Sequence, residues 1–168
     1  RSETKEVCCE WIGSGGAGHF VKMVHNGIEY GDMELIAETY DLARRGMGKD
    51  VETIASYFDR WNKGLLKSFL VEITATILKK KDVDGKPLID AILDVAGQKG
   101  TGKWTALCAL KLGLPITLIT ESVFQRFLSS LFEMRQEASR LFPEGKKVVT
   151  DTLSVEDLES ALYAAKIM

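Results

Sequence analysis

Apolar positions recur at intervals near 3.6 residues over most of the chain, the spacing that aligns side chains on one face of an α-helix. The longest run extends from about 17 to 45 and ends at Gly46 and Gly48. Further helices are predicted from Asp50 to about Trp61, over 63–78, 88–96 and 104–112, from Pro115 to about 142, and from Ser154 onward. No stretch alternates with period two for long enough to predict a strand, and Val148-Val149 is the one brief candidate.

The sequence therefore predicts an all-α fold, a helical bundle built around two long helices at about 17–45 and 115–142. Capping residues support two of the helix starts. Asp50 is a preferred residue before a first helical turn, and Ser154 with Asp157 three residues later fits a capping box.

Composition narrows the class of protein. The chain has 168 residues, 45% of them hydrophobic and 27% charged, which is the balance of an ordinary globular protein. A formal net charge of −2 gives no field that would attract nucleic acid or an anionic membrane, so neither partner is expected. The apolar stretches fall short of the roughly 20 residues of a membrane span, and no signal peptide is expected.

Three cysteines, Cys8, Cys9 and Cys108, form neither a disulfide framework nor a metal-ligand set. We therefore expect a reducing, cytoplasmic setting and no metal site. The chain starts at Arg1 without a methionine and stops at Met168 inside a helical pattern. We expect it to be a piece of a longer protein.

One face of the first predicted helix is polar. It carries Lys22, His25, Asn26, Glu29 and Tyr30, at i, i+3, i+4, i+7 and i+8. At about 1.5 Å of rise per residue, Lys22 and Glu29 lie roughly 10 Å apart along the axis, a gap that suits a small, oxygenated substrate. Lys22 can accept a proton and Glu29 can donate one, and amide, imidazole and phenol groups lie beside them. This combination favours a proton-transfer site.

The alternative is a solvated face with a weak ion pair. Two features favour the site. Histidine and asparagine are poor helix formers, and Gly27 and Gly31 each cost about 1 kcal/mol relative to alanine. A glycine inside a helix often marks the close approach of another backbone or of a ligand.

A glycine-rich loop, Gly97-Gln-Lys-Gly-Thr-Gly-Lys103, matches most of a Walker A phosphate loop. The match fails at Trp104, where a hydroxyl should bind Mg²⁺, and the preceding 89–96 is predicted to be helical where such a loop follows a strand. An NTPase is therefore disfavoured. Phosphate binding through Lys99, Thr101 and the backbone remains one interpretation, and a plain helix connector is the other.

Arg126 lies near the middle of an apolar helical run, between Phe124 and Phe127. It could be a surface residue whose charged end reaches water, or a bidentate anion ligand on a rigid scaffold. Periodicity leaves both open.

These motifs resemble those of one enzyme family. The stretch Gly18-His-Phe-Val-Lys-Met-Val-His-Asn-Gly-Ile-Glu-Tyr-Gly-Asp-Met33 is similar to the catalytic helix of 6-phosphogluconate dehydrogenases. Ile92-Leu-Asp-Val-Ala-Gly-Gln-Lys-Gly-Thr-Gly-Lys-Trp104 resembles the signature loop of that family. Ser122-Val-Phe-Gln-Arg126, followed by Leu128-Ser-Ser-Leu131, resembles its substrate-binding helix.

The resemblance implies a function in the pentose phosphate pathway. Members of the family oxidise and decarboxylate 6-phosphogluconate with NADP⁺, giving ribulose 5-phosphate, CO₂ and NADPH, and they form dimers built largely from this domain. By resemblance, Lys22 is the general base and Glu29 the general acid. His25, Asn26 and Tyr30 orient the substrate, and its phosphate is held by Lys99, Thr101 and Arg126.

The family also has parts that this sequence lacks. Its Rossmann domain carries a Gly-x-Gly-x-x-Gly loop, whereas Gly13-Ser-Gly-Gly-Ala-Gly18 has different spacing and follows no predicted strand. Its C-terminal tail, which reaches across the dimer, is missing as well. We therefore expect 1–168 to be part of the helical substrate-binding and dimerisation domain, with NADP bound mainly elsewhere. A non-catalytic helical interaction module is the alternative.

Overall fold

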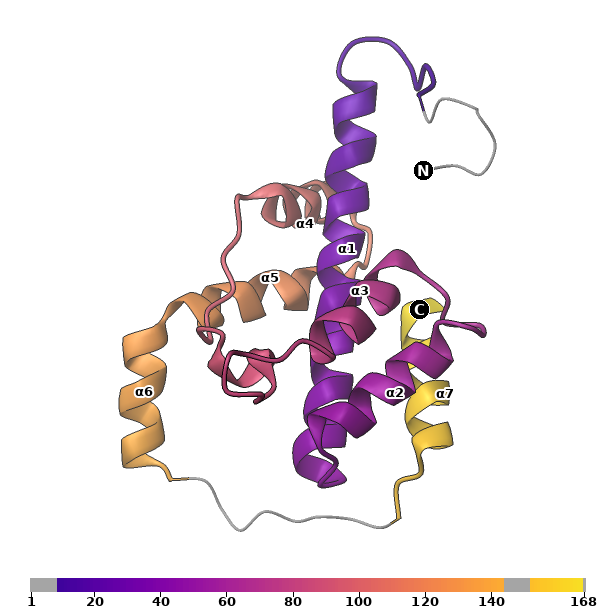
Figure 1. Cartoon of the computed structure of the whole chain (residues 1–168). Coiled ribbons are helices and arrows are strands. Elements are labelled where there is room, and N and C mark those ends of the chain that lie inside the picture. The colour runs from indigo at the N-terminus through magenta and orange to yellow at the C-terminus, as the bar shows by residue number, and fades with distance from the viewer. Residues whose placement is uncertain (1–8, 144–151, 168) are drawn as a thin grey trace.

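The computed structural model describes residues 9–143 and 152–167, and every regular element in these ranges is helical (Figure 1). The α-helices are α1 (Ala17–Asp41), α2 (Val51–Trp61), α3 (Phe69–Leu78), α4 (Thr101–Leu112), α5 (Thr117–Ser130), α6 (Phe132–Leu141) and α7 (Val155–Ile167). A π-helical turn, Leu42–Gly46, extends α1, and a single 3₁₀ turn covers Leu88–Ala91. The predicted all-α class is confirmed.

Helix α1 is the axis of the molecule. Helices α4 and α5 pack against its middle, while α2, α3 and α7 gather around the end that follows (Figure 1). The π-helical turn carries it to Gly46, so the predicted helix 17–45 is confirmed almost to the residue. Gly48, with φ at +66°, adopts the left-handed conformation that turns the chain toward α2.

The hydrophobic core lies where α2, α3 and α7 meet the end of α1. Its largest fully buried side chains are Trp61 and Phe58, which meet edge to face with ring centres 5.1 Å apart. The Asp50 carboxylate accepts a hydrogen bond from the Thr53 amide at 2.7 Å, so the predicted cap is confirmed. Most of the buried hydrophobic residues in the described part of the chain belong to this cluster.

Helix α7 begins with the predicted capping box. The Asp157 amide donates to the Ser154 hydroxyl at 3.0 Å, and the Ser154 amide donates to the Asp157 carboxylate at 3.1 Å. Farther along, the Lys166 ammonium lies 2.7 Å from the Asp32 carboxylate, and both side chains are mostly buried. This ion pair joins α7 to α1.

No helix in the described ranges has the length and apolar character needed to cross a bilayer.

Two of the predicted starts differ from the observed ones. The helix predicted over 63–78 begins only at Phe69, because the chain first turns at Gly64 and then extends at Ser68, whose hydroxyl caps α3 by accepting from the Val71 amide at 3.3 Å. The helix predicted from 104 begins three residues earlier, at Thr101, after Gly100 turns the chain with φ at +100°.

The prediction of a helix over 88–96 is wrong beyond Ala91. After the 3₁₀ turn the chain is extended, with ψ at 136° for Ile92. The run predicted as one helix from Pro115 to 142 is helical for most of its length but divides at Leu131 into α5 and α6. The strand candidate Val148-Val149 lies outside the described residues.

Candidate functional site

The polar face of α1 forms a connected cluster. The Lys22 ammonium lies 3.2 Å from Nδ1 of His25 and 3.7 Å from the Glu29 carboxylate. The Asn26 amide donates to the same Glu29 oxygen at 3.0 Å, and Nδ1 of His25 lies 3.4 Å from it. Four of the five predicted residues meet here, while Tyr30 is buried and stacks with Arg126 instead. The side chains of Lys22 and Glu29 bend toward each other and close the gap expected between them. The Lys22 side chain is 68% exposed, so the described residues do not shield it from water.

Glu29 differs from the expectation for a general acid. The hydrogen bond from Asn26 holds the pKa of Glu29 below its ordinary value, against partial burial, and the charges of His25 and Lys22 lower it further. The carboxyl group is therefore ionised near neutral pH in this arrangement. A role as acid requires a change in these surroundings when a ligand binds.

The glycines on the opposite side of α1 permit close helix packing. A Cβ atom added to Gly27 would lie 3.0 Å from the Thr105 hydroxyl, and one added to Gly31 would lie 3.0 Å from Cγ of Leu118. The Thr105 hydroxyl also donates to the Met23 carbonyl at 3.0 Å. Other groups do approach these glycines closely, but they are side chains of α4 and α5 rather than the backbone or ligand that was expected.

Arg126 on α5 is anchored rather than free. Its guanidinium carbon lies 4.5 Å from the centre of the Tyr30 ring, and Nη1 donates to the Gly97 carbonyl at 2.7 Å. A second nitrogen, Nη2, lies 3.7 Å from the Met33 sulfur. Because guanidinium has five N–H donors, it keeps donors available for an anion. Of the two interpretations left open, this arrangement favours the anion ligand.

The glycine-rich loop begins at the Arg126 contact and runs into α4. Lys99 is exposed, and Thr101 is the first residue of the helix. Gly102 packs directly beneath the Tyr30 ring, since a Cβ atom there would lie 2.9 Å from the ring carbon Cδ2 and from Cγ2 of Val123. The fold thus brings the loop, Tyr30 and Arg126 to one place. Within the described ranges no strand precedes the loop, so the ATPase architecture is absent there.

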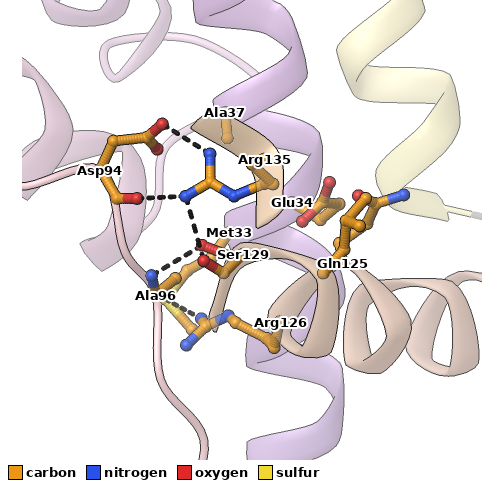
Figure 2. A pocket seen from close by; sticks show the side chains of 10 residues that line it. Met33, Glu34, Ala37, Asp94, Ala96, Gln125, Arg126, Ser129 and Arg135 are labelled. Atoms are coloured by element: carbon orange, nitrogen blue, oxygen red, sulfur yellow. Dashed lines mark hydrogen bonds and ion pairs between the residues drawn. The ribbon is translucent and has the colours of Figure 1, made fainter. Parts of the chain in front are cut away.

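A pocket of about 390 Å³ lies beside Arg126, among residues of α1, α5, α6 and the segment that precedes the glycine-rich loop (Figure 2). Its lining includes Met33, Glu34, Asp94, Gln125, Ser129 and Arg135. Burial raises the pKa of Glu34, helped by Glu38 and opposed by Arg126. Sequence reasoning did not single out Asp94, Ser129 or Arg135. The first two lie inside the quoted motifs, but nothing in their spacing showed that they would meet.

Comparisons of the sequence and of the fold with known proteins point to the same family. The family model for the C-terminal domain of 6-phosphogluconate dehydrogenase matches residues 18–168. The chain belongs to the 6-phosphogluconate dehydrogenase family. It is 58% identical to 6-phosphogluconate dehydrogenase, decarboxylating 1, of Saccharomyces cerevisiae, over 97% of this chain and 34% of the yeast protein. It is 57% identical to the mouse protein named 6-phosphogluconate dehydrogenase, decarboxylating, over 98% of this chain and 35% of the mouse protein.

The fold agrees with the family assignment. The 6-phosphogluconate dehydrogenase of Plasmodium falciparum, described as solved in its apo form and in complex with NADP⁺ and with 6-phosphogluconate, superposes with a TM-score of 0.87 at 40% identity. The match covers 99% of this chain and 36% of that one. The chain thus spans about a third of the length of the 6-phosphogluconate dehydrogenases that it matches.

Proposed function

We propose that this chain provides the proton-transfer residues, and part of the substrate site, of an enzyme that oxidises and decarboxylates 6-phosphogluconate to ribulose 5-phosphate, CO₂ and NADPH. The observation that carries the proposal is the connected cluster of Lys22, His25, Asn26 and Glu29 on α1, with Tyr30 and Arg126 stacked at its end. If this face of α1 only contacted water, nothing would require Arg126 of α5 to be held over the Tyr30 ring.

In this proposal the two ends of the cluster move protons. Lys22, as a neutral amine, takes the proton of the substrate 3-hydroxyl during oxidation and returns a proton to the keto oxygen during decarboxylation. Glu29 donates a proton to C1 of the resulting enediol. A ligand lying between the two would replace their 3.7 Å contact with its own groups and exclude water from Glu29. Loss of the neighbouring positive charge and of water both raise the pKa of a carboxyl group, which is the change that an acid role requires.

The other residues of the site bind and orient the substrate. His25 and Asn26 lie between the two proton carriers and can hold sugar hydroxyls or the carboxylate. Arg126, Lys99 and Thr101 would hold the phosphate. A guanidinium fork matches phosphate geometry, and a lysine and a hydroxyl at the start of α4 add charge and a hydrogen bond.

NADP⁺, when bound, accepts the hydride that leaves C3 of the substrate. In the described part of the chain, Gly13–Gly18 leads into α1 without a preceding strand, so this loop does not fit the dinucleotide motif. We therefore assign most of the NADP⁺ contacts to another part of the protein.

We also propose that the domain forms a homodimer in the cytoplasm. Helices α4, α5 and α6 expose large apolar side chains, among them Trp104, Leu110, Phe124, Leu128 and Leu141. An exposed apolar surface of this extent is typical of a protein interface.

The proposed activity is tested by comparing this chain with the complete protein that contains it. The complete protein should produce NADPH and CO₂ from 6-phosphogluconate, while the 168-residue chain alone should produce none. NADPH formation by the chain alone would contradict the assignment of the NADP⁺ contacts. Its absence with the complete protein would contradict the proposed function.

A further inference from the structure

The side chain of Arg135, on α6, donates three hydrogen bonds. Nη1 donates to the Asp94 carboxylate at 2.8 Å, while Nη2 donates to the Asp94 carbonyl and, at 3.0 Å, to the Ser129 carbonyl (Figure 2). The guanidinium also lies 5.6 Å from the centre of the Phe132 ring. Only 27% of the side chain is exposed. We call the bonded group of Arg135, Asp94 and Ser129 the arginine clamp.

The clamp holds the segment that leads into the glycine-rich loop. This segment, residues 92–97, lies outside every helix, and Ile92 at its start has an extended backbone with ψ at 136°. The Ala96 amide donates to the Ser129 hydroxyl at 2.8 Å, and the Gly97 carbonyl accepts from Arg126 at 2.7 Å. The segment is therefore fixed at Asp94, Ala96 and Gly97 by side chains of α5 and α6.

The clamp depends on the break between α5 and α6. In a continuous helix, residues six positions apart are about 9 Å apart along the axis and point in different directions. Leu131, with φ at −83° and ψ at 53°, ends α5, and α6 leaves in a new direction (Figure 1). This break lets Arg135 return to the Ser129 carbonyl and reach Asp94 at the same time.

The position of the segment determines the position of the loop residues. Successive residues span at most about 3.6 Å, so Lys99 begins no more than about 7 Å from Gly97 along the chain. Thr101 follows at the first turn of α4, which is fixed by its own packing on α1. A shift at Asp94 would therefore move Lys99 relative to both Thr101 and Arg126.

We infer that Arg135 is a positioning residue for anion binding: through Asp94 and Ser129 it fixes the start of the loop so that Lys99 can act on the same phosphate group as Thr101 and Arg126. This inference rests on the proposed function, since it takes the phosphate of a sugar acid as the ligand. Because Asp94 and Ser129 engage Nη1 and Nη2 of Arg135, we assign this residue no direct contact with the substrate. Its effect is on discrimination between phosphorylated and unphosphorylated substrates.

The test compares variants of the complete protein on 6-phosphogluconate and on gluconate, which lacks the phosphate. A misplacement of about 1 Å in a site can cost on the order of 100-fold in rate. We expect Arg135→Gln to lower the ratio of kcat/KM for 6-phosphogluconate to that for gluconate by roughly 10-fold, mainly through KM. Asp94→Asn should give a smaller decrease, because the bond to its backbone carbonyl remains. The Asp94 side chain is 81% exposed, so this variant should fold normally.

Arg140→Gln is the matched control, since Arg140 lies on the same helix and pairs only with the nearby Glu137 among the contacts seen. It should leave the ratio unchanged. Calorimetric binding of inorganic phosphate is measured in parallel and should weaken in Arg135→Gln, so the clamp is tested even without turnover.

Three results would overturn the inference. The first is an unchanged ratio in both clamp variants, and the second is an equal loss on both substrates, which would indicate a structural role. The third is unchanged phosphate binding in Arg135→Gln. Absence of 6-phosphogluconate turnover in the unmodified protein would instead contradict the proposed function.

Discussion

The guanidinium of Arg126 lies over the ring of Tyr30, 4.5 Å from its centre, and this contact joins α5 to the polar face of α1. Tyr30 is only 6% exposed, so its ring offers a fixed platform. The arginine is therefore oriented before any ligand arrives. Pre-oriented groups lose less conformational entropy on binding, which favours affinity.

Replacement of Arg126 tests this role. In the complete protein, Arg126→Ala should raise KM for 6-phosphogluconate while changing kcat much less. A residue that binds the phosphate group stabilises the bound substrate and the transition state about equally. Arg126→Lys keeps the positive charge but loses the planar guanidinium and much of the stacking on Tyr30. Its KM should therefore lie between that of the unmodified protein and that of Arg126→Ala. Steady-state kinetics checks both. A lysine variant that matches the unmodified protein would show that charge alone is sufficient.

Variants of the two proposed proton carriers should lose different steps of the reaction. Lys22→Met should abolish both NADPH and CO₂ production, because the amine acts in both steps. Glu29→Gln should retain more of the oxidation step, visible as a pre-steady-state NADPH signal. General acid and base groups typically contribute about 10²–10⁴-fold, so turnover should fall by that order while substrate binding changes less. If Lys22→Met keeps near-normal turnover, the polar face of α1 is only a solvated surface.

The ionisation of Glu29 can be measured directly. NMR titration of this chain should give a Glu29 pKa below the ordinary value of about 4.3, and Asn26→Ala should raise it, since that hydrogen bond is the largest cause of the shift. Because the pKa is lower in the folded chain, ionised Glu29 stabilises the fold above the ordinary pKa. That contribution disappears as the pH falls through the folded value, and it should be smaller in Asn26→Ala. Gln136→Ala, on α6, is the control and should leave the Glu29 pKa unchanged.

Two glycine substitutions separate packing from helix propensity. Gly102→Ala should destabilise the chain by about 1–3 kcal/mol, because the new methyl group would press on Tyr30 and Val123, which are both buried. Gly18→Ala, also in a helix but with nothing within 4 Å, should be neutral or stabilise by up to about 1 kcal/mol. Urea unfolding measures both. Equal stability of the two variants would show that α4 can move away from Tyr30 without cost.

The exposed apolar surface of α4 to α6 predicts association. Sedimentation at tens of micromolar should show a dimer, and Phe124→Glu should shift it toward monomer, because a charge would be buried in the interface. Phe124 is 59% exposed in the single chain, so the substitution should leave the fold intact. Val83→Glu, at a fully exposed position of the 79–86 loop, is the control. A monomer in the unmodified chain would argue against the proposed dimer.

Elements with local signals could be predicted from the sequence. The start of α7 follows from Ser154 and Asp157, and the start of α2 follows from Asp50. The polar cluster on α1 follows from helical spacing alone, since its members are neighbours on one helix. Gly27 and Gly31 indicated close packing but not which helices would approach.

Elements fixed by distant contacts could not be predicted. Apolar spacing continues across Leu131, so nothing local signals the end of α5. The contact of Arg135 with Asp94 crosses 41 positions of sequence, and that of Arg126 with Gly97 crosses 29. The non-helical segment before the glycine-rich loop is held by the same contacts, and local spacing alone therefore wrongly predicts a helix over 92–96. The ionisation of Glu29 likewise depends on side-chain geometry that spacing does not give.

The glycines at 27, 31 and 102 set how closely α1, α4 and α5 approach one another. At each of them the glycine of one helix lies directly against side chains of a neighbouring helix, namely Thr105 at Gly27, Leu118 at Gly31, and Tyr30 with Val123 at Gly102. Each separation therefore depends on side chains from one of the two helices only. Changing the polar residues of the α1 face would leave these contacts in place. A protein engineer who wished to move the helices apart would have to begin with atoms that the natural sequence leaves out.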